Sequence, residues 1–111
     1  MSYNLNFNTI KKQFMTVTLP DEKQTVLMIG TPTKSLLAEL STLEDQLKNV
    51  ANGDDVSIES LYDACAKIMS RNKAGTKITR QKLEKCLDIE DITVFFYSYI
   101  DFVTTIGNQK N

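Results

Sequence analysis

The sequence contains no histidine and no tryptophan among its 111 residues, and it has only two cysteines, two prolines and four glycines. Without histidine there is no Ser–His or Cys–His nucleophile pair, no histidine metal ligand and no imidazole proton shuttle. The glycines stand singly, at positions 30, 53, 75 and 107, so the chain has no glycine-rich phosphate loop. These absences favour a protein that is not an enzyme and that uses no cofactor.

Acidic residues form no convincing catalytic or metal-binding pattern either. The acidic segment 49–60 has some likeness to a calcium loop, but it lacks the alternating oxygen ligands and the spaced bidentate glutamate that calcium needs. The adjacent pairs Glu44–Asp45 and Glu90–Asp91 would diverge by about 100° on a helix. The sequence therefore predicts surface and helix-capping acids, with no catalytic residue and no metal ligand.

Long hydrophobic runs are also missing, and the net charge is only −1. No run approaches the roughly 18–20 apolar residues of a membrane-spanning helix, and the N-terminus lacks the pattern of a signal peptide. A nearly neutral chain exerts no long-range attraction on nucleic acid or on an anionic membrane. We therefore expect a cytoplasmic protein whose cysteines, Cys65 and Cys86, are free thiols at apolar core positions.

The length predicts a single domain, residues 1–111, with an α+β, mostly α fold. Residues 12–29 are predicted to form an antiparallel β-hairpin, because Met15, Val17 and Leu19 alternate with threonines before a polar turn. A lone hairpin is marginal in water, so one face must pack on the helical part. The ends, 1–10 and 107–111, are polar and are predicted to be mobile.

Residues 32–106 are predicted to form a compact bundle of about four helices. Apolar residues recur at intervals of three and four along the first two helices. In the first helix they are Leu36, Leu37, Leu40, Leu43, Leu47 and Val50. In the second helix they are Ile58, Leu61, Tyr62, Cys65, Ile68 and Met69. Either Thr31 or Thr33 is predicted to cap the first helix, with Pro32 in its first turn. The second is predicted to begin near Ser57 and to close at 73–75, where Gly75 takes a left-handed conformation.

Thr79 and Asp88 are predicted to cap the third and fourth helices. The fourth helix is apolar over most of its circumference, whereas an amphipathic surface helix needs only one apolar stripe. Either this helix is central to the core, or part of its aromatic surface is free for a partner. Tyr97, Tyr99 and Phe102 are the candidate partner-binding residues, since tyrosine combines an apolar ring with a hydroxyl that suits a rim.

Charge is segregated along the chain, with seven acids against one base in 35–63 and seven bases against one acid in 66–86. One interpretation is a helix-turn-helix-like site for DNA, although the connector 72–78 is longer than the turn of that motif. The other is head-to-tail contact between copies, acidic face to basic face. The candidate self-association residues are Arg71, Lys73, Lys77, Arg80, Lys82, Lys85, Glu39, Glu44 and Asp45.

Five segments together resemble a known family. They are Pro32–Leu40 after the hairpin, Leu61–Asn72, Ile78–Thr79 followed by a leucine helix, Leu87–Ile92, and an aromatic helix that ends Tyr99–Val103. In this order they resemble the tail assembly chaperones of long-tailed (siphovirus-type) phages and prophages of Gram-positive bacteria. The resemblance covers residues 12–106 and includes no catalytic signature.

The resemblance implies a non-enzymatic protein that binds the tape-measure protein, keeps it soluble and helps recruit tail-tube (major tail) subunits. It further implies action in the host bacterial cytoplasm and absence from the mature virion. Two other functions stay open at this point: a small helical DNA-binding regulator, and a structural tail or head-tail component. Neither a membrane nor nucleic acid is the partner that the sequence favours.

Overall fold

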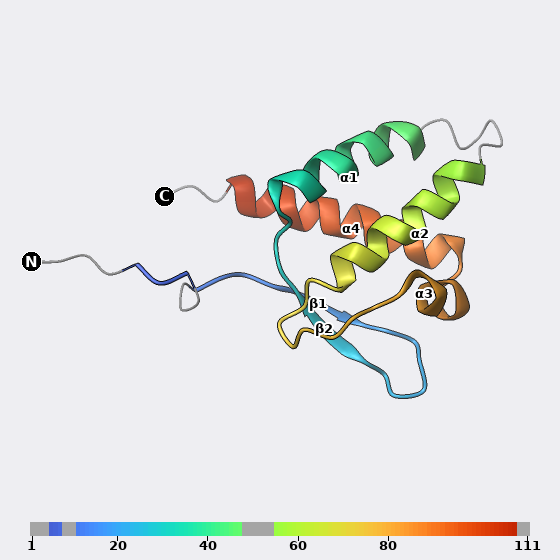
Figure 1. Cartoon of the computed structure of the whole chain (residues 1–111), viewed down its shortest axis with the longest axis horizontal. Helices are drawn as coiled ribbons and strands as arrows, with labels where there is room; N and C mark the ends of the chain where they lie inside the picture. The colour runs from blue at the N-terminus through green and yellow to red at the C-terminus, as the bar shows by residue number, and fades with distance from the viewer. Residues whose placement is uncertain (1–4, 8–10, 48–54, 109–111) are drawn as a thin grey trace, which may run out of the picture.

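The computed structural model describes residues 5–7, 11–47 and 55–108 (Figure 1). The ends predicted to be mobile, 1–10 and 107–111, lie largely outside these residues, as does Val50 of the first predicted helix. The elements in chain order are β1 (Met15–Thr18), β2 (Val26–Ile29), α1 (Lys34–Leu47), α2 (Asp55–Met69), α3 (Arg80–Cys86) and α4 (Ile89–Asn108). The predicted α+β, mostly α fold, an antiparallel hairpin followed by four helices, is confirmed.

The hairpin has the predicted alternation of buried and exposed side chains. Val17 lies opposite Leu27 and Met15 opposite Ile29, and the inward-facing Leu27 and Ile29 are fully buried. At the turn, the Asp21 carboxylate accepts hydrogen bonds from the Thr25 amide (2.8 Å) and the Thr25 hydroxyl (2.6 Å). These two bonds hold the pKa of Asp21 well below its usual range, so the ionised side chain fastens the loop.

The segment after α2 ties the hairpin to the helical part. The Gly30 amide donates to the Arg71 carbonyl (3.0 Å), and the Lys73 amide donates to the Met28 carbonyl (2.9 Å). This segment is not helical, so the prediction that α2 closes at 73–75 is wrong. The helix ends at Met69 because the Asn72 side chain bonds the surrounding backbone instead.

The core lies where α2 meets its neighbours. α2 contacts α1, α3, α4 and β2, and it crosses in front of α4 with the hairpin below (Figure 1). Its inward-facing residues from Leu61 to Met69 are buried as predicted. In α1 the predicted stripe is narrower, because Leu37 is exposed while Leu36, Leu40 and Leu43 are buried.

Side chains cap three of the helices. Thr33 accepts a hydrogen bond from the Leu36 amide (3.2 Å) and Thr79 from the Lys82 amide (3.1 Å). Asp88 accepts from the Asp91 amide (2.8 Å), and Asp91 accepts in return from the Asp88 amide (3.1 Å). The predicted caps are therefore confirmed, with Thr33 as the α1 cap; this places Pro32 before the helix instead of in its first turn.

Candidate interaction surface

One side of α4 packs into the core. Phe95, Phe96 and Tyr99 are all buried, and Tyr99 is 0% exposed. The Tyr99 hydroxyl donates a hydrogen bond to the Gly30 carbonyl (2.8 Å), which links α4 to the end of the hairpin. Burial raises the pKa of Tyr99 to about 12. Tyr99, a predicted partner-binding residue, is therefore not exposed to a partner in this fold, because the ring and the hydroxyl are both engaged inside the protein.

α4 also leaves three large apolar side chains in solvent. Val94 (61% exposed) and Tyr97 (44%) lie away from the buried side, and Ile89 (54%) is exposed as the first residue of the helix; we call these three residues the outer face of α4. The Tyr97 ring meets Phe96 edge-on, with ring centroids 5.4 Å apart. Of the predicted contact residues, Tyr97 is thus available to a partner, while Phe102 is half-buried beside Tyr99.

α4 does not end where it was predicted to. The helix continues through Gly107 to Asn108, two residues beyond the helical part predicted at 32–106. Glycine weakens a helix interior by only about 1 kcal/mol relative to alanine, and the apolar residues of the preceding turns hold this end of α4 against the core.

A groove of about 480 Å³ runs between β1 and α4. Residues 15–20 form one wall, and Glu90, Asp91, Val94 and Ser98 contribute to the other. The sequence does not predict this groove, because the distance between a strand and a helix is not encoded in the periodicity of either. The groove adjoins the outer face of α4 at Val94.

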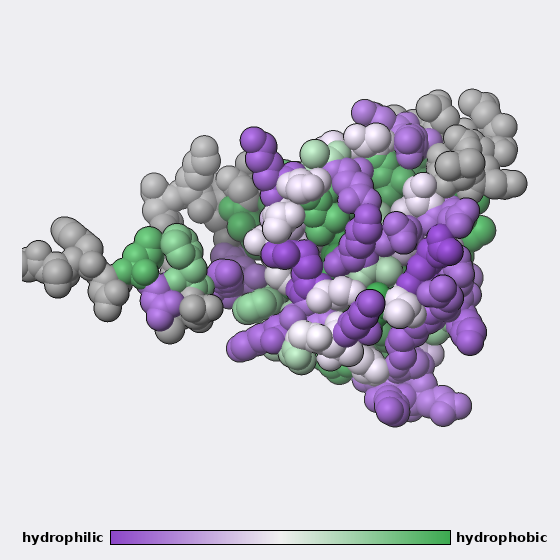
Figure 2. Space-filling view, in the orientation of Figure 1, coloured by the Kyte–Doolittle hydropathy of each residue, from purple (hydrophilic) through white to green (hydrophobic). Residues whose placement is uncertain are grey.

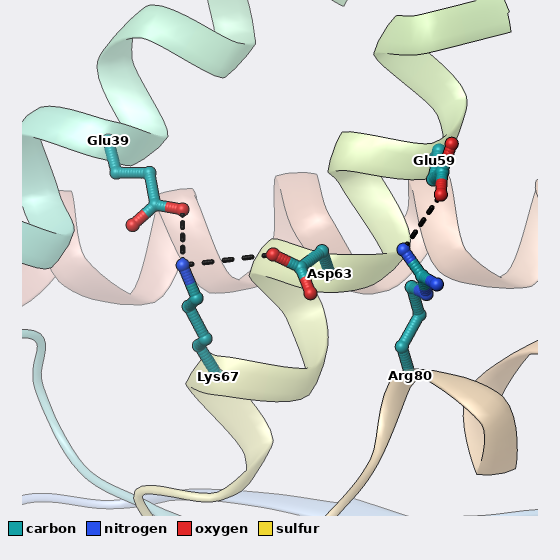
Figure 3. Close-up of polar contacts among 5 residues, drawn as sticks. All are labelled: Glu39, Glu59, Asp63, Lys67 and Arg80. Carbon is teal, nitrogen blue, oxygen red and sulfur yellow. Dashed lines mark hydrogen bonds and ion pairs between the residues drawn. The ribbon is translucent and has the colours of Figure 1, made fainter.

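Charged residues on the other side of the molecule pair within one copy of the chain. The Lys67 ammonium bonds Glu39 of α1 at 3.0 Å and lies 3.7 Å from Asp63 of α2, and the Arg80 guanidinium bonds Glu59 of α2 at 2.8 Å (Figure 3). The hydrogen bond to Glu39 raises the pKa of Lys67. The face of the molecule that carries α2 and α3 is largely hydrophilic (Figure 2).

The remaining candidate self-association residues are placed as follows. Lys82 pairs with Asp21 at 3.1 Å. Arg71 donates two hydrogen bonds to the Thr31 carbonyl (3.1 and 3.0 Å), and the Lys73 ammonium lies over the Phe14 ring, 5.7 Å from its centroid. Asp45 also has a partner. In the described part of the chain, the side chains of this set that make no ion pair, hydrogen bond or ring contact are Lys77, Lys85 and Glu44.

These internal contacts change the interpretation of the charge pattern. The acidic and basic stretches meet across α1, α2 and α3 of the same molecule, so much of the predicted complementarity between copies is already satisfied internally. The same contacts weaken the interpretation of a DNA-binding site, because the Arg80 and Lys82 side chains are already paired with acidic side chains. The connector from α2 to α3 is also long, spanning residues 70–79.

Among residues 5–7, 11–47 and 55–108, no three His, Cys, Asp or Glu side chains gather closely enough to hold a metal ion. Cys65 is buried and Cys86 is half-buried, both are free, and burial raises the pKa of each thiol, which keeps them protonated and poorly nucleophilic. No helix in the described ranges is long and apolar enough to cross a membrane.

Comparison with known proteins adds no further constraint: no family model, curated protein or solved structure matches the chain. The surfaces described above and the resemblance of the sequence therefore carry the functional argument.

Proposed function

We propose that the protein is a phage tail assembly chaperone that binds the tape-measure protein through the outer face of α4. The observation that carries this proposal is that α4 buries a full aromatic face in the core and still exposes Ile89, Val94 and Tyr97. Large apolar side chains left in solvent are typical of a protein–protein contact. The sequence resemblance supplies the identity of the partner.

The physical role follows from the nature of that partner. A tape-measure protein is a very long, largely helical chain whose apolar stripes lack a cover until the tail tube encloses it. A small helical protein with an exposed apolar face can cover such stripes in the manner of helix-in-groove recognition. The chaperone then keeps the tape-measure protein soluble and helps recruit tail-tube subunits around it.

The size of the outer face suits reversible binding. Fully burying a large apolar side chain contributes about 1.5–3 kcal/mol, and these three are already about half covered, so each adds about 1 kcal/mol on binding. About 3 kcal/mol is small beside the entropic cost of association. Single contacts are therefore weak, and many copies along one chain supply the avidity, so that tube subunits can displace them one at a time. Such a protein acts in the host cytoplasm, performs no catalysis and leaves before the virion is complete.

A capture experiment tests this assignment. The tape-measure protein from the same genome is co-expressed with the wild-type chain, with the double variant Val94→Ser, Tyr97→Ser, or with Leu37→Ser. Leu37 is a matched control because it is also a large exposed apolar residue, but on α1. We expect co-purification with the wild type and Leu37→Ser and a loss of at least about tenfold with the double variant, since 1.4 kcal/mol per copy is a factor of ten.

Two other outcomes would each support a different function. If purified virions contain the chain, it is a structural tail or head-tail component. If the tape-measure protein is not captured and the chain binds duplex DNA with a steep salt dependence, it is a DNA-binding regulator.

A further inference from the structure

The N-terminal arm of the chain, residues 1–10, carries the most exposed large apolar side chains in the described structure. Leu5 is 69% exposed and Phe7 is 70% exposed. In the sequence, Tyr3, Leu5 and Phe7 alternate with three asparagines, the period-two pattern of a strand that is apolar on one face and polar on the other. The arm contains no charged side chain, so burying its apolar face would desolvate no charge. The arm therefore has the composition of a strand that lacks a sheet.

The outer edge of β1 offers the backbone groups that such a strand needs. The Leu19 amide bonds the Thr25 carbonyl (2.8 Å), so the odd-numbered residues of β1 are the ones that bond to β2. The amides and carbonyls of Thr16 and Thr18 consequently point away from the hairpin. No hydrogen bond joins these outward groups to another residue in the described ranges.

The outer edge of β2, in contrast, is already covered. The Met28 carbonyl accepts a hydrogen bond from the Lys73 amide, and the Gly30 amide donates to the Arg71 carbonyl. Proteins usually protect an open edge with a lysine, a proline or a bulge, but β1 reads MTVT. An edge without this protection accepts another strand readily, so β1 is the edge of the hairpin that can be extended.

The inward-facing side of β1 also lacks part of its apolar cover. Met15 and Val17 are only half-buried, whereas their partners on β2, Ile29 and Leu27, are fully buried. The groove of about 480 Å³ lies beside them, with Val94 of α4 on its other wall. A strand on the β1 edge would place its own inward-facing side chains over this groove. An occupant with one apolar and one polar face fits both the edge and the groove.

The position of the arm indicates whose β1 edge it fills. Residues 11–14 run into β1 without a turn, and Figure 1 shows residues 5–7 outside the body of the molecule, beyond the N-terminal end of that strand. To reach its own β1 edge the arm would have to reverse direction, but the sequence from Met1 to Leu19 contains neither glycine nor proline, the residues that mark turns most strongly. An arm that extends outward can reach a second copy without a reversal.

We propose that the N-terminal arm of one copy adds as a strand to the β1 edge of a second copy, with Leu5 and Phe7 over the groove. The outward backbone groups of Thr16 and Thr18 supply the main-chain hydrogen bonds. Each copy has one arm and one such edge, so two copies exchange arms and close a dimer. None of the variants that test this exchange alters the outer face of α4, so its failure would leave the chaperone assignment standing.

Sedimentation analysis of the full chain over a range of concentrations tests the exchange. Leu5→Ser with Phe7→Ser removes the apolar face of the arm, and neither residue belongs to the core. Asn4→Ser with Asn8→Ser is the matched control, because it changes the polar positions of the same segment. We expect a dimer for the wild type and for the asparagine variant. The dissociation constant of the Leu5, Phe7 variant should be at least about tenfold higher, since burial of one large apolar side chain is worth that factor or more.

A proline substitution tests the other half of the contact. Thr16→Pro removes an outward-facing amide hydrogen from β1 without removing a bond to β2, and it should also raise the dissociation constant at least about tenfold, equivalent to one or two lost hydrogen bonds. Val26→Pro is its matched control, because the Val26 amide also points outward, but from β2. This control should dimerise like the wild type.

A synthetic peptide of residues 1–10 identifies the edge directly. Titrated into the Leu5→Ser, Phe7→Ser chain and followed by NMR, it should shift the amide signals of Thr16 and Thr18 and leave that of Val26 unchanged. A peptide with the same two serines should shift none of them. The exchange is overturned if the wild type is monomeric at all concentrations, if the Leu5, Phe7 variant associates as tightly as the wild type, if the two proline variants behave alike, or if the peptide leaves the β1 amides unshifted.

Discussion

Replacing Asn72 should unfold the connection between α2 and the hairpin. Its side-chain nitrogen donates to the Met69 carbonyl (2.8 Å) and the Thr76 carbonyl (2.6 Å), its oxygen accepts from the Thr76 amide (2.9 Å), and the residue is 9% exposed. A net contribution of about 1 kcal/mol per hydrogen bond gives a loss of about 2–3 kcal/mol for Asn72→Ala. Urea unfolding followed by circular dichroism measures this change in the free energy of unfolding.

Asn72→Asp changes the hydrogen-bonding groups of the side chain while keeping its shape. The carboxylate can still accept from the Thr76 amide, but its second oxygen faces two carbonyl oxygens where the amide donated. We expect this variant to be at least as unstable as Asn72→Ala at neutral pH and to recover partly in acid, because a protonated carboxyl can donate again. Lys77→Ala is the surface control. A change below about 0.5 kcal/mol for Asn72→Ala, the usual range for a surface substitution, would refute the reasoning.

Three further predictions concern single side chains. Tyr99→Phe should lower the free energy of unfolding by about 1 kcal/mol, by loss of the bond to Gly30; an unchanged denaturant midpoint would contradict this. Cys65 should resist thiol reagents in the native protein and react fully on unfolding, and fast native labelling would contradict its burial. Asp21→Asn should lower the melting temperature at neutral pH. The pKa of Asp21 is depressed on folding, so its stabilisation is present above the unfolded-state pKa and is lost as the pH falls; a difference that persists unchanged in strong acid would contradict that sign.

Features set by local sequence could be predicted well. The alternation around Val17 and the caps at Thr33, Thr79 and Asp88 each depend on residues within one turn or strand, and all agree with the structure. The left-handed conformation of Gly75 was also predicted, and its φ in the structure is 75°. The residue closes a turn, however, and not a helix.

Features set by contacts distant in sequence were missed. Leu37 has the correct spacing for the core, but α2 covers only one side of α1 and leaves it exposed. Tyr99 was assigned to a rim because its hydroxyl needs a partner; that partner is a backbone carbonyl 69 residues away. The opposed charges at Glu39 and Lys67, 28 residues apart, suggested contacts between copies, whereas the fold joins them within one.

The chaperone assignment is tested most directly by the solubility of the tape-measure protein. Its soluble fraction is measured after expression alone and after co-expression with this chain. The account predicts that the tape-measure protein aggregates alone, and stays soluble and co-purifies when the chain is present. An equal soluble fraction in both cultures, with no co-purification, would contradict it.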